Sequence, residues 1–258
     1  MEASEELVQF QLSARWREPE VLLMNSKPLS VLLEEAFVQC RDMDASLAEK
    51  LQAFADAVRR LGPNFQEAVD KLVARLKKQE VGKNAPMPGE KMPPFVLPDQ
   101  NGHLVSLDKM LEHGPVAVTF HRGHWCPYCR INTHALAEAQ GQIEAEGGQI
   151  AAIMPDREHF AAEFQAESAA RFPILTDFDN GYALSLNLAF WVGEEMRDLM
   201  SRSGWDVSRW QGSDTWLLPL PATFVIGSEG DVKARFVDPD YRKRMAIEDL
   251  LSAIRNAH

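Results

Sequence analysis

The stretch Pro115-Val-Ala-Val-Thr-Phe120 leads, through His121-Arg-Gly-His-Trp125, into Cys126-Pro-Tyr-Cys129. The short apolar run predicts a buried strand. The residues from 127 to about 146 predict a helix that ends at Gly147-Gly148. A Cys-x-x-Cys pair therefore stands where a strand passes into a helix, and this junction indicates both the fold and the chemistry.

The position of the two cysteines predicts different roles for them. Cys126 stands where the first N–H groups of the helix lack partners, and these groups and the helix dipole favour a thiolate. Pro127 suits the first helical position, where no N–H is needed. Cys129 follows one turn later, which brings the two sulfurs within bonding reach. We expect Cys126 to be the attacking thiolate and Cys129 the resolving thiol. Three nearby side chains add possible positive charge that favours the thiolate: His121, Arg122 and His124.

These residues have other interpretations. A Cys-x-x-Cys pair can be half of a zinc site, but the sequence has no second Cys-x-x-Cys and no His-x-x-x-His to complete it. An inert structural pair is the other alternative, and redox chemistry is favoured over both. His124 either tunes the thiol or lines the cleft, whereas His121 is expected to be structural. Cys40, on an apolar helical face, is expected to be a packed small hydrophobe.

Residues 1–82 are predicted to form a helical N-terminal segment. Apolar side chains recur at helical spacing from Leu29 to Cys40. Ser46 and Glu49 form a capping-box pattern before a second stripe, and Asn64 is expected to open a third helix. The apolar surface of these stripes is more than one thin helical layer can bury by itself. We therefore expect the stripes to pack on the rest of the chain or across a homodimer.

Residues 83–94 are predicted to be an extended linker because four of the twelve are proline. Residues 95–258 then alternate strands with helices, which predicts an α/β sheet domain. An insertion is expected at about 191–217, where four of the six tryptophans lie. The remaining expected elements are a hairpin at Asn101-Gly102, strands at 149–154 and 173–176, helices capped by Asp156 and Asp179, a hairpin of strands 222–226 and 232–237, and a final helix at 246–256.

Composition and charge narrow the possible partners and the expected location of the protein. The formal charge of −11 argues against nucleic acid or an anionic membrane as the main partner. The start, Met1-Glu-Ala-Ser-Glu-Glu6, has neither the basic residues nor the apolar run of a secretory signal. No run approaches the ~20 apolar residues of a membrane span. Three cysteines are too few for a disulfide scaffold, so a cytoplasmic protein is expected, with no cofactor and no metal.

The segment Thr119–Arg130 resembles the F-Y-R-G-x-W-C-P-Y-C signature of bacterial peroxiredoxin-like proteins of the alkyl hydroperoxide reductase/thiol-specific antioxidant (AhpC/TSA) superfamily. Three further stretches match in order: Phe172–Asp177, Pro221–Ile226 and Phe236–Arg244. The resemblance covers roughly residues 50–256. It implies a thioredoxin-like fold, a central mixed sheet flanked by helices, here preceded by the N-terminal helical segment. It also implies an antioxidant or thiol-disulfide oxidoreductase activity.

The resemblance adds residues that shape the site around Cys126 and Cys129: Arg122, His124, Trp125, Pro127, Tyr128 and Pro221. Pro221 stands where thioredoxin-like folds place a cis-proline, and it is expected to be cis, with Pro219 as the rival. Peroxiredoxins have Thr or Ser where this chain has Gly123, and an Arg where it has Pro221. The buried acid of thioredoxins is replaced by Phe120, so the proton acceptor for Cys129 is unassigned.

These departures favour a dithiol that exchanges with protein or small-molecule disulfides. The first alternative is an atypical peroxiredoxin that reduces hydroperoxides at Cys126, with Cys129 resolving. The second is a redox-sensing binding protein. The expected partners are a disulfide or hydroperoxide substrate, an unidentified thiol reductant and a second copy of the chain in a homodimer, with no nucleic acid and no membrane.

Overall fold

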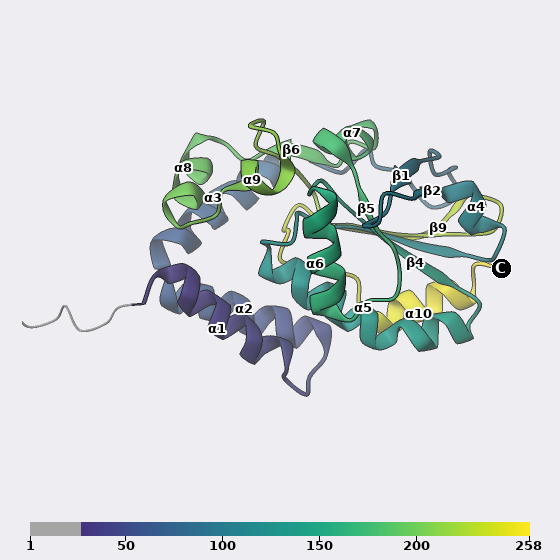
Figure 1. Cartoon of the computed structure of the whole chain (residues 1–258), viewed down its shortest axis with the longest axis horizontal. Helices are drawn as coiled ribbons and strands as arrows, with labels where there is room; N and C mark the ends of the chain where they lie inside the picture. Colours follow the sequence, from purple (N-terminus) through teal and green to yellow (C-terminus); the bar gives the residue numbers. More distant parts are fainter. Residues whose placement is uncertain (1–26) are drawn as a thin grey trace, which may run out of the picture.

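A five-stranded mixed sheet carries the fold in the computed structural model, which describes residues 27–258 (Figure 1). The strand order is β5-β4-β3-β8-β9. β3 runs parallel to β4, and β4 parallel to β5, whereas β3–β8 and β8–β9 are antiparallel pairs. The α/β prediction is confirmed. The strands are β3 (Val116–Phe120), β4 (Gln149–Met154), β5 (Ile174–Thr176), β8 (Ala222–Ile226) and β9 (Val232–Val237).

Helices cover the sheet, which explains why its central strands are apolar on both faces. Every residue of β3 and β8 is buried. α5 (Pro127–Ala145) packs on β4, and α10 (Ile247–Arg255) packs on β3 and β8 and against α5 (Figure 1). α6 (Glu158–Ser168) contacts β5 and α5. α5 is thus fixed on three sides, and its first residues follow directly from the loop after β3.

The N-terminal helices pack on this sheet domain. α1 (Leu29–Arg41) and α2 (Leu47–Leu61) both contact α5, which confirms the expectation that their apolar stripes pack on the α/β part. The Ser46–Glu49 capping box is present. The prediction that Asn64 opens the third helix is wrong: α3 (Pro63–Lys78) has Gly62 as its N-cap and Pro63 at its first position, so Asn64 lies inside the helix. The buried residues of both parts form one cluster. The domain boundaries themselves stay a prediction.

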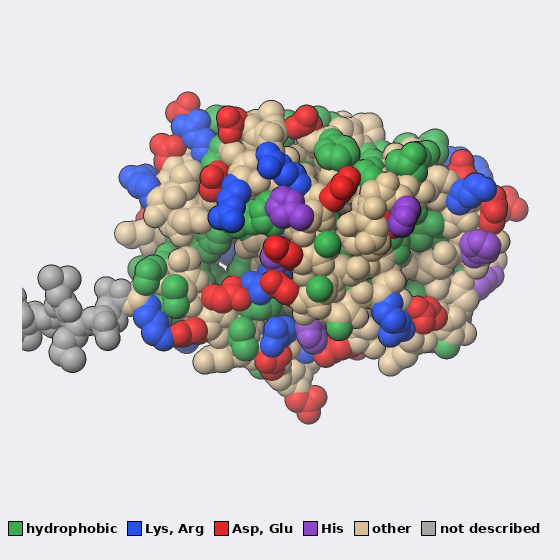
Figure 2. Space-filling view, viewed as in Figure 1, with side chains coloured by type: hydrophobic (Ala, Val, Ile, Leu, Met, Phe, Trp, Pro, Cys, Tyr) green, Lys and Arg blue, Asp and Glu red, His purple; other side chains and the backbone are tan. Residues whose placement is uncertain are grey.

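Ion pairs also join the N-terminal helices to the sheet domain. Arg130 on α5 pairs with Glu34 of α1 at 2.7 Å and with Glu167 of α6 at 3.2 Å. The Arg130 guanidinium lies 3.9 Å from the ring centroid of Phe37. Figure 2 shows acidic and basic side chains interspersed on this face of the molecule. α1 is therefore held against the helix that starts at the cysteines.

The proline-rich stretch 83–94 lies along the turn between β8 and β9. Gly89 N–H donates to Val232 O at 2.8 Å, and Met92 N–H donates to Gly230 O at 2.9 Å. The extended conformation predicted for this stretch holds only near Lys91, which forms an isolated bridge with Asp231. Residues 83–90 instead contain turns, in which the Ala85 N–H donates to Gly82 O and the Glu90 N–H donates to Met87 O.

The expected insertion is a small subdomain beside α3 (Figure 1). It contains a two-stranded antiparallel sheet and two helices, and α8 contacts α3. The Arg75 side chain on α3 donates to Trp191 O at 2.6 Å and to Val192 O at 2.9 Å. Its elements are β6 (Ala189–Trp191), α8 (Glu194–Arg202), α9 (Val207–Gln211) and β7 (Leu217–Pro219).

The predicted hairpin at Asn101-Gly102 is confirmed, and the sequence analysis missed a short helix after it. The remaining elements are β1 (Val96–Pro98), β2 (Leu104–Ser106), α4 (Leu107–Leu111), a 3-10 turn (Phe178–Asn180) and α7 (Gly181–Ser185). No helix among residues 27–258 is long and apolar enough to cross a membrane. The predictions made for residues 1–26 lie outside the described residues.

Three further local predictions were wrong. Asp156 does not cap α6, because Arg157 occupies the N-cap and the Asp156 carboxylate turns inward. Asp179 does not cap α7, because Asp177 accepts the N–H groups of Tyr182 and Ala183 at 2.8 and 2.9 Å. Neither Pro221 nor Pro219 is cis, since residues 27–258 contain no cis peptide bond. The chain runs extended from β7 into β8 with the trans bond that most X-Pro pairs adopt.

Candidate active site

Cys126 is the N-cap residue of α5, and Cys129 lies in the first turn of the same helix. The loop from β3 delivers Cys126 to this position, and its N–H donates to Gly123 O at 3.1 Å. Both thiols are free, with exposed fractions of 1% and 0%. Within residues 27–258 no three His, Cys, Asp or Glu side chains gather as a metal site.

Two arginines face the two sulfurs. The backbone N–H of Arg122 donates to Cys129 Sγ at 3.3 Å, and its guanidinium Nη1 lies 4.0 Å from Cys126 Sγ. The guanidinium Nη2 of Arg244, from the segment after β9, lies 3.4 Å from Cys129 Sγ. The dithiol thus sits between two positively charged side chains, one from the loop after β3 and one from the segment after β9.

This environment shifts the pKa values of the two thiols in opposite directions. Burial alone would raise the pKa of Cys126, but the Cys129 thiol hydrogen bond and the Arg122 and Arg244 charges lower this pKa to about 6. Burial raises the pKa of Cys129 well above its usual range, and the neighbouring Cys126 raises it further. These shifts favour a thiolate at Cys126 and a protonated thiol at Cys129, and the attacking and resolving roles stay predictions.

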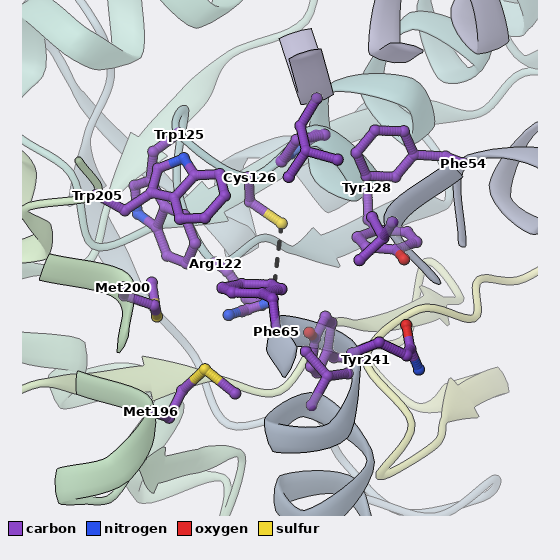
Figure 3. Close-up of a pocket in the computed structure, with 15 residues that line it drawn as sticks. Phe54, Phe65, Arg122, Trp125, Cys126, Tyr128, Met196, Met200, Trp205 and Tyr241 are labelled. Carbon is purple, nitrogen blue, oxygen red and sulfur yellow. Dashed lines mark hydrogen bonds between the residues drawn. The ribbon is translucent and has the colours of Figure 1, made fainter. Parts of the chain in front are cut away.

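Aromatic rings hold the Arg122 guanidinium in place. It lies 3.9 Å from the ring centroid of Tyr241 and 4.8 Å from that of Trp125 (Figure 3). The residue is 4% exposed. Stacking between two rings restricts the rotation of the guanidinium, so its charge stays directed at the Cys126 sulfur.

A narrow apolar pocket opens onto Cys126 (Figure 3). Its free volume is about 40 Å³, room for a few water-sized atoms. Its walls come from the cysteine loop, the N-terminal helices and the 191–217 subdomain. The lining residues are Leu33, Phe54, Val58, Phe65, Gln66, Val69, Arg122, Trp125, Cys126, Pro127, Tyr128, Met196, Met200, Trp205 and Tyr241.

The structure brings four of the six predicted shaping residues into this pocket: Arg122, Trp125, Pro127 and Tyr128. The ring of His124 turns away toward α6, 3.0 Å from Glu167 and 3.8 Å from Glu163. Pro221 is buried before β8 and does not line the pocket. His121, which the sequence analysis expected to be structural, is fully buried, and burial and the Arg244 charge lower its pKa to about 3, so it is neutral.

Several residues of the site were missed by the sequence analysis. Tyr241 and Arg244 lie in the stretch Phe236–Arg244, whose resemblance to the superfamily was the available signal. The insertion contributes Met196, Met200 and Trp205. Its high tryptophan content did not indicate that it lies beside the cysteines. Phe54 and Phe65 looked like ordinary core residues, and only the packing of the helices places them at the pocket.

Asp156 is a buried acid beside the cysteine loop. Its Oδ2 accepts the His124 backbone N–H at 2.7 Å, and its Oδ1 has no partner among the described residues. A Cβ added at Gly123, where φ is +141°, would lie 2.8 Å from Oδ1. Burial raises the pKa of Asp156 to about 7, and the Cys126 charge acts in the same direction. The small residue at 123 therefore leaves room for this carboxyl group.

Asp156→Asn is expected to flatten the pH dependence of stability. A folded-state pKa raised from 3.8 to about 7 gives a stabilising contribution that is full below pH 4 and is lost as pH rises through 7. The loss is on the order of 4 kcal/mol at most. Urea unfolding at pH 5 and pH 8 measures it. The difference between wild type and variant reports Asp156 together with its interaction with the Cys126 charge, because groups that do not interact with Asp156 are common to both.

Glu158→Gln, at an exposed residue two positions later, is the matched control and is expected to keep the wild-type pH dependence. Equal pH dependence in wild type and Asp156→Asn would contradict the assignment of a buried, raised carboxyl group.

Comparison with known proteins agrees with this geometry. The model of the AhpC/TSA family matches residues 88–235, more than half of the chain. The chain belongs to the AhpC/TSA family. Two curated proteins from Mycobacterium tuberculosis strains CDC 1551 and H37Rv, each provisionally named a peroxiredoxin, are 32% identical over 92 residues. The match covers 36% of this chain and 58% of each relative, so the chain spans little more than half of their length.

Solved structures of family proteins share the fold. Peroxidoxin BcpB from Mycobacterium tuberculosis superposes with a TM-score of 0.52 and 19% identity, over 67% of this chain and 99% of that one. A cysteine-to-serine mutant of peroxiredoxin 6 from Arenicola marina gives 0.51 and 16%, over 65% and 71%. These likenesses show the thioredoxin-like fold, as the sequence analysis expected.

Proposed function

We propose that this AhpC/TSA protein is an oxidoreductase that reduces small hydroperoxides at Cys126, with Cys129 of the same chain as the resolving thiol. One observation carries the proposal: the buried Cys126 lines a narrow apolar pocket whose other walls include helices of the N-terminal segment and of the 191–217 subdomain. The residues involved come from the sequence analysis, and the pocket favours its peroxidase alternative over exchange with protein disulfides.

The size of the pocket supports a small substrate. Thiol–disulfide exchange with a protein needs a disulfide sulfur to reach the thiolate in line. Cys126 is only 1% exposed, and Phe65, Met196 and Trp205 wall the approach. A small hydroperoxide can enter about 40 Å³ with little rearrangement, whereas a folded protein would have to displace α3 or α8.

The proposed reaction balances with the two thiols. The Cys126 thiolate attacks the outer oxygen of ROOH, the O–O bond breaks, and RO⁻ leaves and takes a proton to give an alcohol. Cys126 becomes a sulfenic acid. Cys129 then attacks the Cys126 sulfur, an S–S bond forms, and the hydroxyl leaves as water. An external thiol reductant restores both thiols and is itself oxidised to a disulfide.

Arg122 supplies the charge that this reaction needs. Peroxiredoxins polarise the peroxide with a Thr or Ser hydroxyl, and this chain has Gly123 at that position. The Arg122 guanidinium, 4.0 Å from Cys126 Sγ and fixed between two rings, is placed to stabilise the developing charge on the leaving oxygen.

A second candidate, exchange with protein disulfides, draws on the Cys-Pro-Tyr-Cys sequence at the start of α5. The test measures both activities on one preparation. Hydrogen peroxide or tert-butyl hydroperoxide is expected to convert the reduced protein to the Cys126–Cys129 disulfide far faster than it oxidises free cysteine, and reduction of insulin disulfides is expected to be slow. Fast insulin reduction together with peroxide oxidation no faster than that of free cysteine would overturn the proposal.

A further inference from the structure

Arg244 is a buried cation with no carboxylate partner among residues 27–258. Its neighbours are paired: Arg242 with Asp240 at 2.7 Å, and Lys243 with Asp238 at 2.9 Å. Arg244 instead turns inward, is 9% exposed, and directs Nη2 to Cys129 Sγ at 3.4 Å. Its position is therefore explained by the sulfurs and by local carbonyl groups alone.

A buried positive charge is unfavourable unless a negative charge or strong acceptors compensate it. Nη1 of Arg244 donates to Tyr241 O at 2.6 Å and to Lys243 O at 2.7 Å, which satisfies part of the group. Nη2 is directed at the Cys129 sulfur, and Nε has no hydrogen-bond partner among the described residues. In the resting state Cys126 holds the one thiolate, and Arg122 already faces that sulfur.

The distribution of charge around Arg244 changes when Cys126 reacts. Once Cys126 is a sulfenic acid or a mixed disulfide, its negative charge is gone, and the Arg244 guanidinium and the Arg122 backbone N–H remain directed at Cys129. The Cys126 charge that raised the pKa of Cys129 is then removed, while Arg244 continues to lower this pKa against the effect of burial. The second thiol is thereby favoured to lose its proton only after the first has reacted.

We propose that Arg244 is a positioning residue for the resolving step, which holds and stabilises the Cys129 thiolate as it attacks the oxidised Cys126 sulfur. The inference rests on the dithiol roles in the proposed function. In the step, the Cys129 S–H bond breaks, the S–S bond forms, and the hydroxyl or thiol carried by Cys126 leaves with the proton.

The variants separate charge from shape. Arg244→Gln removes the charge and keeps an N–H donor for the nearby carbonyls, and Arg244→Lys keeps the charge. Arg242→Gln is the matched control, because Arg242 lies two residues away, pairs with Asp240 and Asp70, and contacts neither sulfur. Urea unfolding of each variant verifies that it is folded.

The test uses 4,4′-dithiodipyridine, a small apolar disulfide, on the full-length reduced protein. Cys126 attacks it and releases one thiopyridone in a phase that depends on probe concentration. Cys129 then attacks the mixed disulfide and releases a second thiopyridone, in a phase whose rate does not depend on probe concentration. At pH 8, Arg244→Gln is expected to slow the second phase at least ~10-fold and move its pH dependence upward, with the first phase changed less than ~3-fold.

Arg244→Lys is expected to recover most of the second-phase rate, and Arg242→Gln to match wild type. A second phase unchanged in Arg244→Gln, or both phases slowed equally, would overturn the role of Arg244. Because the probe is a disulfide, slow reaction with hydroperoxides would refute the proposed peroxidase activity and leave this result standing.

Discussion

Cys126→Ser is expected to abolish oxidation by hydroperoxides, with a loss of at least ~10³-fold in the rate of peroxide consumption. A serine hydroxyl is not ionised at neutral pH and is a poor nucleophile. Cys129 is not expected to replace Cys126, because its sulfur is fully buried and burial raises the pKa of its thiol. Peroxide consumption in the presence of a dithiol reductant measures the loss.

Two cysteine variants serve as comparisons for that result. Cys40→Ser is expected to keep wild-type peroxide consumption, because Cys40 is packed in α1 and burial raises the pKa of its thiol. Cys129→Ser is expected to react once and stop at a Cys126 sulfenic acid that dimedone can trap. Full peroxide consumption by Cys126→Ser would remove this residue from the reaction.

Arg122→Met is expected to slow the reaction of Cys126 at pH 7 at least ~30-fold. Two unit charges 4 Å apart interact by roughly 4 kcal/mol at an effective dielectric constant of about 20. Half of that energy, about 2 kcal/mol, corresponds to the ~30-fold change in rate. Without the guanidinium, burial raises the pKa of Cys126 with less opposition, so less thiolate is present. Methionine keeps a linear apolar side chain between Tyr241 and Trp125. Thiolate absorbance against pH and stopped-flow oxidation measure the two effects.

Arg130→Met is the matched control for Arg122→Met. Arg130 also stacks on an aromatic ring, that of Phe37, and lies one residue after Cys129, but its charge faces Glu34 and Glu167. Its replacement is expected to leave the thiolate transition in place. Equal effects of the two substitutions would show that Arg122 acts through packing and not through its charge on Cys126.

The strand and helix pattern was predictable because local rules determine it. The apolar run 115–120 is a strand, and Pro127 begins α5 as its missing N–H suggests. The capping-box pair Ser46 and Glu49 begins α2. The predicted caps Asp156 and Asp179 failed because Asp, in a loop, can bond several backbone groups, and only tertiary contacts select one of them.

The environment of the thiols was less predictable, since it depends on contacts distant in sequence. The nearby positive charge was expected from Arg122, His121 and His124, yet only the arginine points toward the sulfurs. His121 is buried and neutral, and His124 faces two glutamates. Arg244 reaches Cys129 across 115 residues of sequence, a contact that no local pattern indicates.

The pocket likewise could not be predicted from the sequence around the cysteines. The motif, together with Gly123 and Pro221, favoured a dithiol that exchanges with protein or small-molecule disulfides. The packing of α2, α3 and α8 encloses Cys126 instead, with side chains from all three contributing to the pocket. The expected substrate changes with this enclosure, from a protein disulfide to a molecule small enough to enter.

The central claim is that a buried Cys126 thiolate reacts with small hydroperoxides. Its most direct test is the pH dependence of the rate at which hydrogen peroxide oxidises the reduced protein, followed by tryptophan fluorescence, since Trp125 borders the pocket. The predicted result is a rate far above that of free cysteine, half-maximal near pH 6. A rate no greater than that of free cysteine, with a midpoint near its ordinary pKa of ~8.5, would contradict the claim.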